Sequence, residues 1–284
     1  MSSQIVRAYA KINLGLHVSG PRPDGYHFIA SLFQTIDLYD VLDIRIRSEP
    51  GISLTVTGIP VPADAKNLVV RAYRAAAERL PFGVDVALSK HIPTGAGLGG
   101  GSADAAVFLL AMRELHPSLS AAKVAEIAPT LGADVPFFLT GGTALVQGIG
   151  EIIQPMPPTD YAAFVMFFPP VSVSTADAYD AYDRLAVSPL AAPPPITPQL
   201  MRGQDLTNAL ESAVLQLHPE FEWVLELVQR IVRRRPVMSG SGSTFFLPFN
   251  TLKEAQDCQT ALNGRLPWTM QVVRPTSGSY SIQV

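Results

Sequence analysis

The stretch PTGAGLGGGSADAA occupies residues 93–106 and is the most distinctive part of the chain. Five of the seven residues from 95 to 101 are glycine, which accepts positive φ and lets a ligand approach the backbone without meeting a Cβ. A small-residue, helix-favouring stretch follows from Ala105 to Leu115, with Ser102 as the expected N-cap. Free N–H groups at the start of a helix and the positive end of its dipole bind phosphate. The stretch therefore predicts a phosphate-binding loop rather than a flexible linker or a tight strand-to-helix turn.

Size and composition describe a globular protein with a substantial core. The 284 residues are 48% hydrophobic and 16% charged, and a chain of this length commonly forms two domains. A net charge of −3 argues against nucleic-acid binding driven by bulk charge. Cys258 is the only cysteine, which excludes an intrachain disulfide.

The sequence shows neither a signal-peptide pattern nor an apolar run near the roughly 18 residues that a membrane span needs. We therefore expect a cytoplasmic protein without nucleic-acid or membrane partners. We expect it to act on a small molecule, as a monomer or a weak homodimer.

Apolar and polar residues alternate from Val6 to Val18, which predicts a half-buried strand. Lys11 and Asn13 are two residues apart on this strand, so their side chains should project the same way. Further strands are predicted at residues 42–46, 52–56, 84–88, 143–147, 162–168, 244–247 and 269–274. Besides the helix after the loop, helices are predicted at residues 67–80, 120–131, 206–217, 221–234 and 252–262.

Strands and helices follow one another without a regular βαβ repeat, which favours an α+β fold. Three prolines between residues 155 and 158 mark a change in composition, and we place a domain boundary there. The predicted domains are residues 1–156, which contain the loop, and residues 157–284. A proline-rich stretch at residues 189–198 is predicted to lie on the surface.

The loop does not fit three well-known phosphate-binding patterns. Its Gly95-x-Gly97-x-x-Gly100 spacing matches the dinucleotide pattern, but that pattern needs a second strand ending in an acidic residue about 20 positions later. Here that distance leads to Glu114, inside the helix that follows the loop. The Lys-Ser/Thr ending of a Walker A loop is absent, and so are the His-Arg-Asp and Asp-Phe-Gly motifs of protein kinases.

Further motifs occur in order along the chain. They are AKINL at 10–14, RPDGYH at 22–27, GADVPFF at 132–138, NALE at 208–211 and MSGSG at 238–242. Together with the loop, they resemble the GHMP kinase superfamily, which includes galactokinase, homoserine kinase, mevalonate kinase and phosphomevalonate kinase. The motif at 22–27 is the most specific, since it resembles the members that act on a cytidine diphosphate-linked methylerythritol.

This resemblance implies a two-domain GHMP kinase fold. The N-terminal domain would resemble ribosomal protein S5 domain 2, the C-terminal domain would be ferredoxin-like, and ATP and substrate would meet between them. The implied reaction is ATP-dependent phosphorylation of the 2-hydroxyl of the cytidine diphosphate-linked methylerythritol, in non-mevalonate isoprenoid biosynthesis. Two alternatives stay open: a GHMP kinase acting on a mevalonate-type or sugar alcohol, and a nucleotide-binding scaffold without catalysis.

The resemblance assigns catalysis to Asp134 and Lys11. Asp134 would receive or orient the hydroxyl proton, and the Lys11 ammonium would stabilise charge on the transferred phosphoryl group. The residues alone also allow a turn or helix-cap aspartate and an exposed lysine on an edge strand.

Substrate binding is assigned by the same resemblance. Tyr26 and His27 would recognise the cytosine, Tyr179 would supply a second ring, and Thr175 would contact the substrate. Asn13, next to Lys11 on the predicted strand, would hold the diphosphate or the sugar chain. An exposed turn remains the structural alternative for the pair at 26–27.

The residues that the resemblance assigns to ATP are Pro93, Thr94, Gly95, Ala96, Gly97, Leu98, Gly99, Gly100, Gly101, Ser102 and Ala103 in the loop, and Asn67 and Lys90 near the adenine. Asn67 and Lys90 are also ordinary choices for a surface. Ser102 would lie near a Mg²⁺ ion bound with the ATP. The small-residue turn at 239–242, otherwise a tight hairpin, would close over the site from the second domain.

Overall fold

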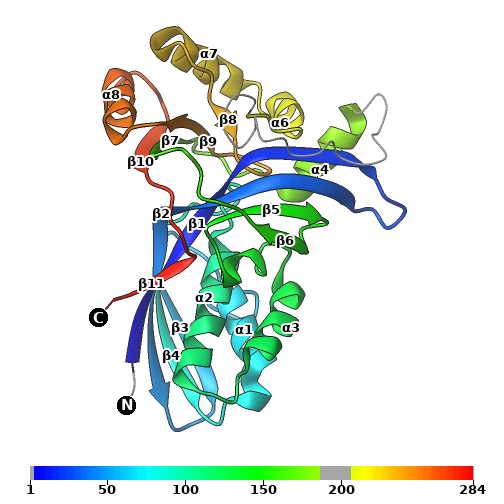
Figure 1. Ribbon diagram of the computed structural model, residues 1–284, viewed down its shortest axis with the longest axis vertical. Helices are drawn as coiled ribbons and strands as arrows, with labels where there is room; N and C mark the ends of the chain where they lie inside the picture. The colour runs from blue at the N-terminus through cyan, green and yellow to red at the C-terminus, as the bar shows by residue number, and fades with distance from the viewer. Residues whose placement is uncertain (1–2, 186–205, 284) are drawn as a thin grey trace.

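The computed structural model describes residues 3–185 and 206–283, which form two units joined by a long hairpin (Figure 1). The hairpin strands are β1 (Ser3–Pro21) and β2 (His27–Arg47). Both are longer than predicted, because the residues beyond the alternating segments continue the same pairing. The proline-rich stretch at 189–198 lies outside the described residues.

Within the described ranges, seven strands form the first sheet. Its main order is β11-β1-β2-β4-β3, with β5 paired to β2 and β6 paired to β5. The remaining bounds are Gly51–Gly58 for β3, Gly83–Lys90 for β4, Thr143–Gly148 for β5, Ile152–Pro155 for β6 and Tyr280–Gln283 for β11. The pairing is antiparallel except between β3 and β4. β6 and β11 were not predicted, and β11 brings the end of the described chain back to β1.

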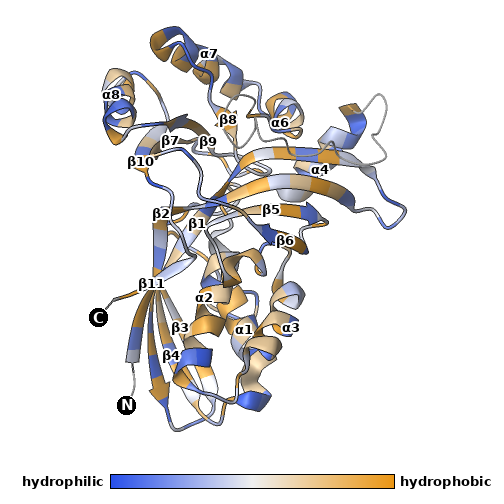
Figure 2. Ribbon diagram, viewed as in Figure 1, coloured by the Kyte–Doolittle hydropathy of each residue, from blue (hydrophilic) through white to orange (hydrophobic). Residues whose placement is uncertain are grey.

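Helices cover one face of this sheet. They are α1 (Leu68–Ala76) with the 3₁₀ turn η1 (Ala77–Arg79), α2 (Gly100–Leu115), α3 (Ala121–Leu131) and the 3₁₀ turn η2 (Phe137–Leu139). Helix α2 is the central one, and hydrophobic residues dominate it in Figure 2. Ser120 caps α3 as predicted. The cap predicted at Ser102 is wrong, because α2 already begins at Gly100 and its N-cap is Gly99, with φ of 68°.

The second unit contains a four-stranded sheet in the order β10-β7-β9-β8. Its strands are β7 (Ala163–Phe168), β8 (Val237–Met238), β9 (Phe245–Phe249) and β10 (Thr269–Val273). Its helices are α4 (Thr175–Leu185), α6 (Glu211–Leu217), α7 (Glu220–Val232) and α8 (Leu252–Leu262). The helix predicted at 206–217 is therefore shorter, since Asn208 instead accepts a hydrogen bond from the Leu210 N–H and starts a turn. No helix in the described ranges has the length and apolar character needed to cross a membrane.

Strand β1 contributes to each hydrophobic core in turn. Val6 and Ala8 pack under the helices of the first sheet, residues 10, 12 and 14 pack in a central cluster, and Leu16 and Val18 pack with the second unit. Register shifts after Tyr9 and after Asn13 accompany these changes of neighbour, as bulges do when a strand bends. The strand therefore buries both faces, and its polar residues near the middle lie between the two units.

Candidate active site

The glycine-rich loop connects β4 to α2. Gly95, Gly97 and Gly99 have φ of 61°, 73° and 68°, a region that side chains rarely adopt. A Cβ on Gly97 would lie 2.1 Å from the Ser239 carbonyl oxygen, and one on Gly99 would lie 2.9 Å from the Phe138 ring. Glycine is required at these positions both by the backbone conformation and by the close packing.

The loop turns its carbonyl groups toward the protein. The carbonyls of Gly95, Ala96, Gly97 and Leu98 accept hydrogen bonds from the Val173 N–H at 3.0 Å, the Thr244 N–H at 3.3 Å, the Ser239 hydroxyl at 3.2 Å and the Lys11 N–H at 3.0 Å. In contrast, none of the N–H groups from Thr94 to Ser102 donates a hydrogen bond within the described chain. The loop and the first turn of α2 therefore present free backbone donors, which is what an anionic ligand requires.

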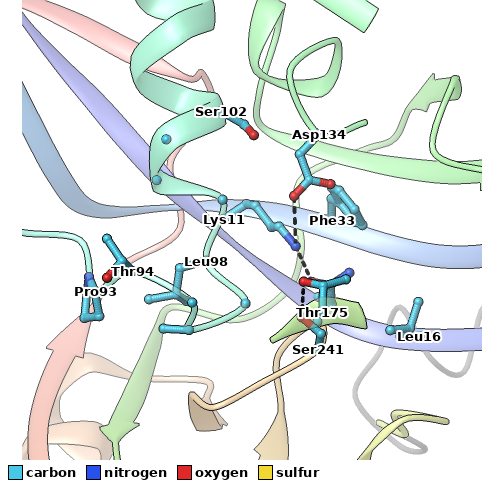
Figure 3. Close-up of a pocket in the computed structure, with 18 of the residues that line it drawn as sticks. Lys11, Leu16, Phe33, Pro93, Thr94, Leu98, Ser102, Asp134, Thr175 and Ser241 are labelled. Atoms are coloured by element: carbon cyan, nitrogen blue, oxygen red, sulfur yellow. Dashed lines mark hydrogen bonds and ion pairs between the residues drawn. The ribbon is translucent and has the colours of Figure 1, made fainter. Parts of the chain in front are cut away.

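These donors border a cavity of about 390 Å³. Residues 93–102 line it together with Lys11, Asn13, Asp134, Thr175 and Ser241 (Figure 3). The structure thus brings most of the predicted ATP-binding residues and both predicted catalytic residues to one cavity.

Lys11 and Asp134 point toward each other across this cavity (Figure 3). The Lys11 Nζ lies 3.6 Å from the Asp134 Oδ2, and it donates a hydrogen bond of 2.6 Å to the Asn13 Oδ1. It also lies 4.5 Å from the centre of the Phe33 ring, a cation–π distance. Burial lowers the pKa of Lys11, and the nearby Asp134 carboxylate opposes that shift. The lysine is therefore not an exposed residue of an edge strand.

Asp134 follows α3 and precedes η2. Its side chain is one-third exposed, and its only recorded partner in the described chain is Lys11. It makes no hydrogen bond to a helix end or a turn there, so the structural alternative of a cap or turn residue does not describe this side chain. A carboxylate held beside an ammonium and open to a cavity can accept or orient a proton.

The turn at 239–242 reaches the site from the second unit. The Ser239 hydroxyl accepts a hydrogen bond of 3.1 Å from the Asn13 N–H while it donates to the loop. Ser241 lines the cavity, and its hydroxyl lies 3.0 Å from that of Thr175. The Asn208 amide donates to the carbonyls of Met238 and Gly240 at 2.8 and 2.7 Å, which explains why the motif at 208–211 accompanies this turn.

A second cavity, of about 600 Å³, adjoins the first. Tyr26, His27 and Tyr179 line it; the Tyr26 side chain is largely exposed, whereas His27 is buried. The His27 and Tyr179 rings are 4.9 Å apart at an angle of 39°. Burial, reinforced by Asp134 and Tyr182, raises the pKa of Tyr179 to about 12, which keeps its hydroxyl neutral. Five of the described residues line both cavities and form their common border: Ile29, Ser102, Asp134, Thr175 and Tyr179.

Asn67 and Lys90 take structural positions. Asn67 is the N-cap of α1, accepting from the Val69 N–H at 2.9 Å, and it lines neither cavity. Lys90 lines the first cavity but is only 2% exposed, and its ammonium forms ion pairs with Asp40 and Asp104. The alternative of an ordinary surface lysine does not describe Lys90, because the lysine and its two carboxylate partners are buried together.

Sequence reasoning missed several residues that shape the site. Phe33 under Lys11, the pair Asp40 and Asp104, and Asp183 beside His27 all depend on contacts between residues far apart in the chain. For Asp183 a signal did exist: Tyr179, Tyr182 and Asp183 have the spacing of one helical face.

Comparisons with known proteins agree with this arrangement. A family model described as the GHMP kinases N terminal domain matches residues 67–142, which include the loop and Asp134. The chain is 38% identical to the 4-diphosphocytidyl-2-C-methyl-D-erythritol kinase of Carboxydothermus hydrogenoformans over 95% of this chain and 96% of that protein. It is 40% identical to the protein of the same name from Pelotomaculum thermopropionicum, over 84% and 86% of the two chains.

Solved structures give the same result. A crystal structure of 4-(cytidine 5'-diphospho)-2C-methyl-D-erythritol kinase matches with a TM-score of 0.80 and 35% identity, over 95% of this chain and 99% of that one. A homoserine kinase from Cytophaga hutchinsonii matches with a TM-score of 0.74 at 20% identity, over 100% and 98% of the two chains, a likeness of fold alone. The α+β two-domain GHMP fold predicted from the sequence is thereby confirmed, and the chain belongs to the 4-diphosphocytidyl-2-C-methyl-D-erythritol kinase family of the GHMP kinases.

Proposed function

We propose that this protein transfers the γ-phosphoryl group of ATP to the 2-hydroxyl of 4-diphosphocytidyl-2-C-methyl-D-erythritol, giving the 2-phosphate and ADP. One observation carries the proposal: Asp134, with Lys11 3.6 Å away, lies on the border between the two cavities. We call the first, lined by residues 93–102, the loop cavity, and the second, lined by Tyr26, His27 and Tyr179, the aromatic cavity. A donor held in the first cavity and an acceptor held in the second would meet at this border.

The loop would hold the ATP phosphates. Within the described chain, its N–H groups from Thr94 to Ser102 donate no hydrogen bond while the carbonyls from Gly95 to Leu98 are engaged, and α2 adds the positive end of its dipole. Backbone donors that are already fixed need little reorganisation when the phosphates bind, which is how phosphoryl-transfer enzymes position their donor.

Lys11 and Asp134 would carry the chemistry. As the acceptor oxygen bonds to the γ-phosphorus, the bond from that phosphorus to the bridging oxygen breaks, and ADP leaves with the electron pair. The hydroxyl proton passes to Asp134, and the Lys11 ammonium faces the negative charge on the transferred group. Asn13 and Phe33 keep that ammonium in place.

A Mg²⁺ ion would fit beside Ser102 and Asp134. Their hydroxyl and carboxylate oxygens border both cavities, and oxygen atoms are the ligands that Mg²⁺ prefers, together with phosphate oxygens and water. When bound, the ion supplies charge neutralisation on the ATP phosphates.

The aromatic cavity would hold the cytidine part of the acceptor. Tyr26 and Tyr179 offer ring faces for stacking, and His27 offers a ring nitrogen to the edge of the base. Thr175, on the border, would contact the part of the acceptor that leads toward Asp134.

The test is turnover of the purified protein with ATP and the proposed acceptor. ADP release coupled to a new phosphomonoester signal in ³¹P spectra is expected, with cytidine diphosphate as a competitive inhibitor against the acceptor. Turnover of mevalonate without inhibition by cytidine diphosphate would replace the proposed acceptor with another alcohol. Tight ATP binding without turnover of either acceptor would favour the scaffold alternative.

A further inference from the structure

Helix α4 places three side chains against the His27 ring. Tyr179, Tyr182 and Asp183 lie three and four residues apart, so they share one face of the helix. The ring centres of Tyr179 and Tyr182 are 4.9 and 6.2 Å from that of His27, and the Asp183 Oδ1 is 2.8 Å from the His27 Nε2. The Tyr182 hydroxyl also donates to the Val18 carbonyl at 3.0 Å, which fixes α4 to β1.

The two nitrogens of the His27 ring have different surroundings. The imidazole is 5% exposed and its Nε2 bonds to a carboxylate that can only accept, so the proton of the neutral ring belongs on Nε2. Nδ1 makes no hydrogen bond within the described chain. Solvent still reaches this nitrogen, unlike the buried side-chain atoms that lack a partner. Because His27 lines the aromatic cavity and its Nδ1 has no partner in the described residues, a lone pair on Nδ1 would be available to a ligand held in that cavity.

We propose that Asp183 is a positioning residue that fixes the Nε2–H form of His27, so that Nδ1 accepts a hydrogen bond from the exocyclic amino group of cytosine and disfavours uracil. This inference rests on the proposed function and adds a residue that sets base specificity.

The chemical basis is the difference between the two pyrimidines. Cytosine carries an amino group at C4, which donates to an acceptor, whereas uracil carries a carbonyl oxygen there. A lone pair on Nδ1 attracts the amino group of cytosine and repels the carbonyl oxygen of uracil. If Asp183 did not hold the Nε2 proton, the ring could place a proton on Nδ1, which would then favour the uracil carbonyl. Sites that pair buried polar groups with one ligand reject an analogue that cannot make the same hydrogen bond.

The experiment compares Asp183→Ala and Asp183→Asn with Asp177→Asn as the control. Asp177 lies on the same helix and its change removes the same charge, but it lines neither cavity. Dissociation constants of cytidine diphosphate and uridine diphosphate are measured for each variant, with the KM of both substrates and kcat. For Asp183→Ala we expect the preference for the cytidine nucleotide to fall at least tenfold and the acceptor KM to rise at least tenfold, while the ATP KM stays within twofold. The cytidine preference of Asp183→Asn should lie between those of the wild type and Asp183→Ala, because the asparagine amide can form a hydrogen bond with either tautomer of the His27 ring.

Long-range ¹H–¹⁵N spectra of the wild-type protein, recorded with cytidine diphosphate bound, report the His27 protonation directly. The proton is expected on Nε2 alone. A proton on Nδ1, or a cytidine preference in Asp183→Ala within twofold of that in Asp177→Asn, would overturn the inference. Neither measurement needs turnover, so a failure of the proposed function, seen as no phosphorylation by the wild type, is distinguishable from a failure of this inference.

Discussion

Replacing Asp104 with asparagine should leave the folded protein as stable as the wild type or more stable at pH 8. Asp104 lies on α2 behind the glycine loop, where it and Asp40 share the buried Lys90 ammonium. Burial raises the pKa of Asp104 from 3.8 to about 7, outweighing the opposing effect of Lys90, and Asp40 adds to the rise. One oxygen of this carboxylate, Oδ1, is buried without a hydrogen-bond partner in the described chain. An asparagine resembles the protonated acid, since it can accept from Lys90 and donate to Asp40.

The direction of the pH effect follows from the raised pKa. The folded protein binds this proton more tightly than the unfolded chain, so the stability that the group contributes is complete below pH 3.8 and disappears as the pH rises through about 7. The gap between these pKa values corresponds to roughly 4 kcal/mol, at about 1.36 kcal/mol per pKa unit. The Lys90 ammonium and the Asp40 carboxylate both interact directly with Asp104, so only part of this energy appears as a change in stability, and we expect a loss of about 2 kcal/mol between pH 5 and pH 8 in the wild type.

Urea unfolding followed by tryptophan fluorescence at several pH values measures this loss. In Asp104→Asn, the free energy of unfolding should change much less between pH 5 and pH 8 than in the wild type. Asp257→Asn, which replaces an exposed carboxylate paired with Lys253, should keep the wild-type pH profile. Lys90→Met should destabilise by about 3–5 kcal/mol, since it leaves two buried carboxylates without their cation. A wild-type pH slope in Asp104→Asn, or a destabilisation above about 2 kcal/mol at pH 8, would refute the reasoning.

Three other changes separate the roles of the site residues. Asp134→Asn should lower kcat by about 100-fold or more with little effect on the KM for ATP, measured by coupled ADP release; an unchanged kcat would remove the residue from catalysis. Gly97→Ala should abolish measurable ATP binding in calorimetry, because its Cβ would lie 2.1 Å from the Ser239 carbonyl oxygen, whereas Gly101→Ala, with 3.6 Å to its nearest neighbour, should still bind. Equal ATP affinities for these two variants would contradict the role given to the loop. Asn67→Ala should cost about 1 kcal/mol in urea unfolding through loss of the α1 cap and leave the KM for ATP unchanged; a tenfold rise in that KM would instead support adenine contact.

Much of the secondary structure could be predicted from local patterns. The alternation around Lys11, the Ser120 cap and the helix at 252–262 are each encoded by neighbouring residues, and the structure has them. The position of the loop was predictable for the same reason, since five of the seven residues from 95 to 101 are glycine. The exact start of α2 was not, because a glycine in the left-handed conformation took the place of the serine cap.

The surroundings of the charged residues could not be predicted in this way. Lys90 and Asp40 are 50 residues apart, and His27 and Asp183 are 156 apart. Local sequence patterns do not identify the first pair, and for the second they indicate only that Asp183 shares a helical face with Tyr179. Polar residues on a strand are ordinarily assigned to an exposed face, and this assumption fails for Lys11 because bulges carry β1 between two cores. Long-range pairing is the part of the site that periodicity does not encode.

The free donors of the loop depend on both units of the protein. Four hydrogen bonds within the described residues hold the carbonyls from Gly95 to Leu98. Lys11 supplies one of them, and Val173, Ser239 and Thr244 from beyond residue 156 supply the others. A peptide plane cannot turn its carbonyl without turning its N–H, so the groups that fix these carbonyls also fix the direction of the amides. The shape of the predicted phosphate site is therefore set by the docking of the second unit as much as by the glycines. Ser239 has a central part in this, because its one hydroxyl joins the loop to the strand that carries Lys11.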